Sequence, residues 1–167
     1  MEKLIAGILN FSKIGMTKTK KEPIDLNVLA NEAFDSIDIN KNFEFKIVDT
    51  LPTIKGVKAL YIQILSNIIS NAIKFNDKEK GELDIFYNDL GNKHQLLFKD
   101  NGPGIPDEYQ EKVFGILQTL DTSSSIRNTG IGLSIVKKII TNLRGKIYIE
   151  SVLNKGTSFI IELPKKK

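Results

Sequence analysis

The chain has 167 residues, of which 41% are hydrophobic and 26% are charged, as expected for a soluble domain with one hydrophobic core. It contains no cysteine and a single histidine, His94, so thiolate metal sites, cysteine nucleophiles and histidine-rich zinc sites are excluded. The net charge of +4 comes from mostly scattered basic residues without interleaved aromatics, so nucleic acid is not an expected partner. No apolar run reaches the roughly 18 residues of a membrane-spanning helix, and no signal-peptide pattern opens the chain.

The N-terminal part of the chain divides into a helical and a polar segment. Between residues 2 and 16, apolar side chains recur at a 4-3-4 spacing, which predicts a helix. The stripe is compatible with a coiled-coil or bundle seam and equally with a plain amphipathic helix, because it is too short to separate the two. Residues 17–24 are polar and basic and contain Pro23, which predicts a linker, and residues 165–167 form a basic tail.

Between residues 25 and 164, helical and strand patterns are mixed, which predicts an α+β domain. Asp25 is placed to cap a helix over roughly residues 26–39, and a second helix begins near Val57. His94 falls on a predicted strand without a companion catalytic residue and is expected to be a strand-surface residue. Strands are predicted at residues 43–48, 82–88, 93–99, 145–151 and 157–163, and the last four form two hairpins.

One side of the helix that ends near Phe75 is unusually polar. At about 100° per residue, four polar residues fall within roughly one quarter of its circumference: Gln63, Asn67, Asn71 and Lys74. Amide oxygens can ligate a hard cation and a lysine can meet a phosphate, so this stripe could face a ligand cavity. A solvated helix face with chance asparagines explains it about equally well, although asparagine forms helix less readily than the glutamate and lysine usual there.

Two glycine-rich segments follow. Asp100 ends a predicted strand and opens DNGPGIP, where a carboxylate can accept from an exocyclic amine and the glycines leave room for a flat heterocycle. An Asx turn with incidental glycines is the structural alternative. Gly130 and Gly132 open a helix, whose unpaired N–H groups and positive dipole favour a phosphate, although many such starts are only tight turns. The spacing is neither the Rossmann fingerprint nor Walker A.

In this order, the motifs of residues 25–164 resemble the catalytic, ATP-binding domain of sensor histidine kinases, within the GHKL ATPase superfamily. NIISNAIKF resembles the N box, DNGPGIP the G1 box, KVFGIL the region of the F box, NTGIGLSIVKKI the G2 box and KGTSF the last glycine motif. The resemblance implies the Bergerat fold, a two-layer α+β sandwich in which a mixed, mainly antiparallel sheet carries helices on one face. ATP would lie under a flexible lid.

The resemblance also implies roles for the residues that match the motifs. Asn71 would ligate Mg2+, Lys74 would face phosphate, and Asp100 would accept the adenine amine. Arg127, within the expected lid between Leu117 and Asn128, is our own candidate for a γ-phosphate contact. The implied catalytic residues are Asn67, Lys74 and Arg127, and the implied nucleotide-binding residues are Asn67, Asn71, Lys74, Phe75, Asp100, Gly102, Gly104, Ile105, Gly130, Gly132, Leu133 and Thr157.

Three positions depart from the family patterns. Asn128 replaces the usual first glycine of the G2 box, which could alter the approach to phosphate, and Leu117 replaces the second phenylalanine of the F box. Asn67 stands where gyrase-like ATPases carry a water-activating glutamate, so hydrolysis by that route loses its general base. Transfer to a protein histidine needs no activated water, and Asn67 therefore favours a kinase.

The phospho-accepting histidine is not expected within this sequence. Residues 1–16 resemble only the end of the second helix of a dimerisation hairpin, and His94 lies between ATP-site motifs, which makes it a poor acceptor. The expected partners are the dimerisation and histidine-phosphotransfer domain of the parent chain and a downstream response regulator. We expect a fragment, or a chain acting in trans, that is monomeric and cytoplasmic, whether or not its parent is a membrane sensor.

These observations predict an Mg–ATP-binding kinase domain whose parent autophosphorylates a histidine. Positioning and charge neutralisation of the γ-phosphoryl group would supply most of the catalysis. One alternative with the same fold is an ATP-hydrolysing conformational machine, against which Asn67 argues. Another is a degenerate module that scaffolds a partner without catalysis, which Asn128 and Leu117 leave open.

Overall fold

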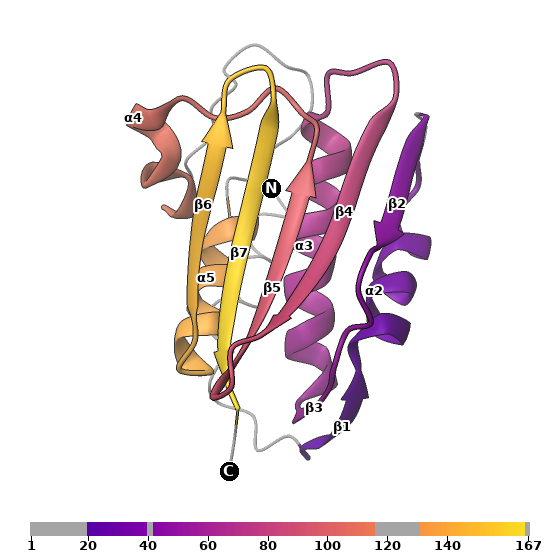
Figure 1. The fold of residues 1–167 in the computed structure, drawn as a ribbon, viewed down its shortest axis with the longest axis vertical. Helices are drawn as coiled ribbons and strands as arrows, with labels where there is room; N and C mark the ends of the chain where they lie inside the picture. Colours follow the sequence, from indigo (N-terminus) through magenta and orange to yellow (C-terminus); the bar gives the residue numbers. More distant parts are fainter. Residues whose placement is uncertain (1–19, 40–41, 116–130, 166–167) are drawn as a thin grey trace.

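The computed structural model describes residues 20–39, 42–115 and 131–165 (Figure 1). Its main sheet has the spatial order β2 (Phe43–Ile47), β4 (Gly81–Asp89), β5 (Lys93–Asp100), β7 (Gly156–Pro164) and β6 (Lys146–Val152). β2 runs parallel to β4, and the other neighbouring pairs are antiparallel. Figure 1 shows α2 (Leu26–Asp35), α3 (Lys58–Phe75) and α5 (Gly132–Asn142) on one face of this sheet. The predicted two-layer α+β fold is confirmed.

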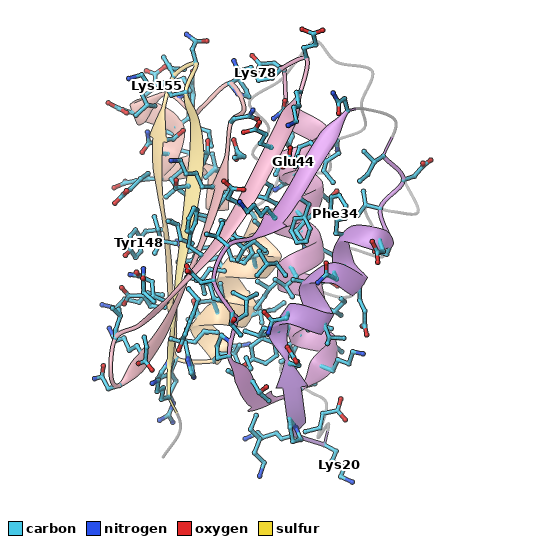
Figure 2. All side chains as sticks on the ribbon, turned by 45° about the vertical axis from the view of Figure 1, so that its right-hand side comes forward. Lys20, Phe34, Glu44, Lys78, Tyr148 and Lys155 are labelled. Carbon is cyan, nitrogen blue, oxygen red and sulfur yellow. The ribbon has the colours of Figure 1, made fainter. Side chains whose placement is uncertain are left out.

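The core lies between the sheet and these helices. Because side chains alternate across a strand, every second residue of the central strands faces the helices and is buried. Phe34 of α2 stacks on Phe45 of β2, with ring centroids 4.5 Å apart (Figure 2). The residues buried on the sheet side include Leu83, Ile85, Leu96, Phe98, Phe159 and Ile161, and those from α3 and α5 include Ile64, Ile68, Ile69, Ile135, Val136 and Ile139.

The first helix of the domain begins where the sequence predicts. Oδ1 of Asp25 accepts hydrogen bonds from the backbone N–H groups of Asn27 and Val28, at 2.8 and 3.4 Å, which confirms the N-cap. The helix ends at Asp35, four residues before the predicted boundary at 39. Ser36 follows, and its hydroxyl donates to the carbonyl of Ala33 at 2.8 Å, a local bond of the kind that competes with helix.

The predicted linker over residues 17–24 is wrong at its C-terminal end. Glu22–Asp25 forms the strand β1, which pairs antiparallel with β3 (Thr53–Gly56) in a separate two-stranded sheet. Pro23 is tolerated because β1 pairs on one side only. The buried residue of this strand is Ile24, and its single apolar side chain among polar neighbours gives too weak a pattern to reveal a strand.

A short helical stretch follows β5. It consists of α4 (Asp107–Gln110) and the 3-10 helix Lys112–Phe114. Along the described ranges, no helix combines the length and apolar character needed to cross a membrane.

Candidate functional site

The fold places the motifs beside one another in pairs. Asp100 closes β5, and β7 begins beside it, because these strands pair from Lys99 and Ser158 onward. The start of α5 lies against α3, since a Cβ atom added to Gly132 would stand 3.1 Å from Oδ1 of Asn67. The fold therefore brings together motif residues that are up to about sixty-five residues apart in the sequence.

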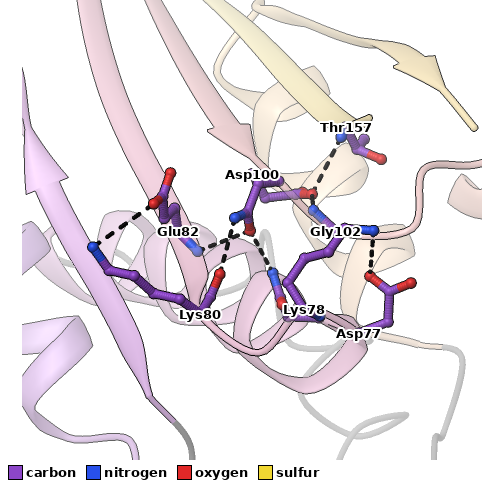
Figure 3. A network of polar contacts seen from close by, with 9 residues as sticks. Asp77, Lys78, Lys80, Glu82, Asp100, Gly102 and Thr157 are labelled. Carbon is purple, nitrogen blue, oxygen red and sulfur yellow. Dashed lines mark hydrogen bonds and ion pairs between the residues drawn. The ribbon is translucent and has the colours of Figure 1, made fainter. Parts of the chain in front are cut away.

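Asp100 is held in one orientation. Its Oδ1 accepts the N–H groups of Gly102 at 2.8 Å and Thr157 at 3.2 Å (Figure 3). Burial raises the pKa of the Asp100 carboxyl above its ordinary value, while these two hydrogen bonds oppose the rise. Oδ2 receives no hydrogen bond from the residues that the structure describes. An oriented carboxylate with one unused oxygen is suited to accept an N–H group from a ligand.

Two glycines make this arrangement possible. A Cβ atom on Gly102 would stand 2.9 Å from Oδ1 of Asp100, and one on Gly156 would overlap the carbonyl oxygen of Asp100. Gly156 also has a φ of 122°, which other residues rarely adopt. The last glycine motif therefore acts at the carboxylate, together with Thr157, whose side chain is buried.

The loop after Asp100 is bound to the β6–β7 hairpin. The N–H of Ile105 donates to Oγ of Ser151 at 2.8 Å, and that oxygen lies 2.8 Å from Oγ1 of Thr157. The amide nitrogen of Gln110 donates to the carbonyls of Ile105 and Ser151, each at 3.1 Å. Sequence reasoning missed Ser151 and Gln110, because only the β6–β7 register brings Ser151 opposite Thr157.

Asn67 faces the start of α5 with an unsatisfied group. Its Nδ2 atom is buried and has no hydrogen-bond partner in the described part of the chain. An unpaired buried amide costs about 1–3 kcal/mol, so this site suits a ligand oxygen, from a phosphate or from water on a cation. Amide oxygens are also donors that Mg2+ accepts. The side chain of Asn67, beside the start of α5, therefore fits a hydrated Mg2+ ion with a phosphate group.

The remaining polar residues of α3 lie where the stripe predicts. Asn67, Asn71 and Lys74 are half-buried, whereas the apolar residues between them are buried. The ammonium group of Lys74 lies 5.7 Å from the ring centroid of Phe75, and that ring is 43% exposed. Leu133 is half-buried in the first turn of α5. The ligand roles predicted for these residues stay predictions.

Several predicted positions lie outside the described residues. They are Arg127, Gly130, the expected lid from Leu117 to Asn128 and the first helix over residues 2–16.

His94 is remote from this site. It is the second residue of β5, whereas Asp100 is the last, so about 20 Å of strand separates them at roughly 3.3 Å per residue. Its Nδ1 atom lies 2.9 Å from the hydroxyl of Tyr87, and burial lowers the pKa of the imidazole. This position agrees with a strand residue that has a structural partner.

Comparison with known proteins supports one family. The model described as "Histidine kinase-, DNA gyrase B-, and HSP90-like ATPase" matches residues 56–167. Cyanobacterial phytochrome B of Nostoc sp. is 32% identical over 98% of this chain, and the sensory kinase SasA of Thermosynechococcus vestitus is 33% identical over 84%. The chain spans about a fifth of the phytochrome, 22%, and 38% of SasA.

A solved structure gives the same assignment. The catalytic domain of the histidine kinase ThkA has a TM-score of 0.72 and 31% identity, with 88% of this chain and 97% of that one covered. ThkA in complex with the response regulator TrrA has a TM-score of 0.74 and 28% identity, covering 99% and 47%. Fold, motifs and family model agree: the chain belongs to the histidine kinase-, DNA gyrase B- and HSP90-like ATPase family.

Proposed function

We propose that the chain is the Mg–ATP-binding catalytic domain of a two-component sensor histidine kinase, which transfers the γ-phosphoryl group of ATP to a histidine of a dimerisation domain. The observation that carries this proposal is the Asp100 carboxylate, oriented by two backbone N–H groups with Oδ2 left for a ligand. A second supporting observation is the unpaired amide of Asn67, which lies beside Gly132 at the start of α5.

In this proposal, Asp100 selects the adenine ring. Its Oδ2 accepts the exocyclic amine, while Oδ1 remains bonded to Gly102 and Thr157. The backbone of Gly102 and Gly104 lies beside the ring, and the Ile105 side chain lines the pocket. A base without an amine at this position would leave Oδ2 of the partly buried carboxylate without a donor, which disfavours that base.

The phosphate side is formed by α3 and the start of α5. Asn71 would ligate Mg2+, Asn67 would donate to a phosphate oxygen, and Lys74 would approach the phosphates. Gly132 and Leu133 present backbone N–H groups at a helix start, where negative charge is favoured. Mg2+ supplies neutralisation of the charge on the phosphoryl oxygens. Gly130 and Arg127 complete the predicted set, and Phe75 borders the nucleotide.

Transfer to a protein is favoured over transfer to water. A neutral amide cannot remove a proton from water, and Asn67 occupies the position from which a general base would act. Catalysis then depends on positioning and on electrostatic stabilisation of the γ-phosphoryl group, which the oriented groups of this site can supply.

The partners follow from the same proposal. The phospho-acceptor is a histidine on a dimerisation domain of the parent protein, and the phosphoryl group passes on to a response regulator in the cytoplasm. The solved complex of ThkA with TrrA supports this type of partner. The domain alone is proposed to be monomeric.

The test separates transfer from hydrolysis. The chain is incubated with γ-labelled ATP and Mg2+, with or without a dimerisation hairpin that carries one acceptor histidine. We expect label on the hairpin as an acid-labile, base-stable phosphohistidine, and little free phosphate without it. Rapid steady-state phosphate release without the hairpin, and no label on it, would instead indicate an ATPase.

A further inference from the structure

Two asparagines outside the predicted site are bonded to each other beside it. Asn76 is the first residue after α3, and its side chain is buried, with 6% of the residue exposed. Asn101 directly follows Asp100. Nδ2 of Asn76 donates to Oδ1 of Asn101 at 2.8 Å, one of the contacts drawn in Figure 3. This amide bridge, Asn76–Asn101, joins the end of α3 to the end of β5.

Asn101 anchors its side of the amide bridge in the sheet. Its backbone N–H donates to the carbonyl of Glu82 at 3.3 Å, and its Oδ1 accepts the N–H of Glu82 at 2.9 Å. Its Nδ2 donates to the carbonyl of Lys80 at 3.0 Å. The side chain thus provides the acceptor that a continued backbone ladder would provide. The main chain can therefore leave the sheet immediately after Asp100.

Asn76 anchors the other side. Its Oδ1 accepts the N–H of Lys78 at 2.9 Å, and a Cβ atom on Gly102 would stand 4.0 Å from its Cα atom. The helix end fixed in this way carries Asn71 and Lys74, which lie five and two residues before Asn76. The amide bridge is therefore a direct link between the phosphate side of the site and the residue next to Asp100.

We propose that Asn76 and Asn101 are positioning residues, which set the spacing between the adenine-binding carboxylate and the metal- and phosphate-binding end of α3. The inference rests on the proposed function, since it concerns a ligand that spans both parts. Adenosine contacts only the Asp100 side, whereas Mg–AMPPNP contacts both. Breaking the amide bridge therefore weakens Mg–AMPPNP and spares adenosine, because Gly102 and Thr157 still orient Asp100.

Two matched variants distinguish the loss of the amide bridge from the effect of an added negative charge. Asn76→Asp replaces the donor by an oxygen that faces Oδ1 of Asn101, so the bridge is lost. Asn101→Asp adds the same charge at the same contact and keeps an acceptor for both Asn76 and Glu82, and the contact it loses is the donor to the carbonyl of Lys80, which lies outside the bridge. Asn76→Leu, of similar shape and without charge, removes the bridge in a third way and serves if Asn76→Asp does not fold.

The experiment measures Mg–AMPPNP binding by calorimetry and adenosine binding by NMR titration, with thermal unfolding as a check on folding. We expect Asn76→Asp and Asn76→Leu to weaken Mg–AMPPNP about tenfold, the effect of one lost buried hydrogen bond, and adenosine less than about twofold. Asn101→Asp should change both by less than about threefold.

Other outcomes overturn the proposal. Equal weakening of both ligands by the Asn76 variants would indicate a general structural role, and no weakening would indicate no role. A loss of Mg–AMPPNP binding as large in Asn101→Asp as in Asn76→Asp would indicate a charge effect. If the wild-type chain does not bind Mg–AMPPNP, the proposed function itself fails, and the positioning role fails with it.

Discussion

At the scale of single residues, folding and ligand binding favour different protonation states of Asp100. Its carboxyl group is partly buried, which favours the neutral form and raises its pKa. A ligand N–H group requires an acceptor, which the ionised form supplies best. The two backbone N–H groups that donate to Oδ1 stabilise the ionised form, but they offset the effect of burial only in part. Charged Asp100 therefore reduces the stability of the unliganded domain.

This cost predicts a pH-dependent effect of Asp100→Asn on stability. Below the ordinary pKa of 3.8, Asp100 is neutral in the folded and unfolded states, so burial of its charge costs nothing. As the pH rises through its higher folded-state pKa, the wild type loses stability relative to the variant, whose amide is always neutral. The difference in melting temperature, variant minus wild type, should increase from pH 3.5 to pH 7, as followed by circular dichroism at about 222 nm. A difference that is constant or falls over this range would contradict the assignment.

At the scale of elements, the loop from Gly102 to Pro106 is shaped by its contact with the β6–β7 hairpin. Gly104 has a φ of 75°, and a Cβ atom there would overlap the carbonyl oxygen of Val152. The N–H of Asn154 donates to the carbonyl of Pro103 at 2.7 Å from the same hairpin. The glycine is thus required by its backbone conformation and by close packing together.

Gly104→Ala is therefore expected to destabilise the domain by about 2–4 kcal/mol, the sum of left-handed strain and overpacking. The matched control is Gly91→Ala, because Gly91 has a similar φ of 78° but no atom within 4 Å of an added Cβ. That variant should lose only about 1–2 kcal/mol of strain. Urea titration measures the free energy of unfolding of both variants, provided that its dependence on urea concentration has the same slope as in the wild type. Equal losses at the two positions would show that the hairpin contact contributes nothing.

The main elements could be predicted from sequence because their patterns are strong and local. The β4–β5 and β6–β7 hairpins have alternating strands around polar turns, and α3 and α5 have long apolar stripes. β1 could not be predicted, because its four residues gain their structure from β3, which lies about thirty residues further along the chain. Propensity and periodicity carry no information about such a distant partner.

At the scale of the whole molecule, the candidate site combines the end of β5 and the start of β7 with polar residues of α3 and the start of α5. The sequence motifs named Asp100, Asn67 and Gly132, and the fold brings their elements together. The supporting contacts could not be predicted. The contact of Ser151 with Thr157 depends on the β6–β7 register, and the Asn76–Asn101 bridge depends on where α3 ends relative to β5. Neither arrangement can be read from the sequence.

The account depends on Asp100 as the acceptor for an adenine nucleotide, and calorimetric titration of Mg–AMPPNP into wild type and Asp100→Asn tests this most directly. Asparagine keeps an oxygen for Gly102 and Thr157 but presents an N–H donor towards the adenine amine. We predict saturable binding to the wild type and at least roughly thirtyfold weaker binding to the folded variant, about 2 kcal/mol for a charged hydrogen bond. No binding to the wild type at millimolar nucleotide, with the variant behaving identically, would contradict the account.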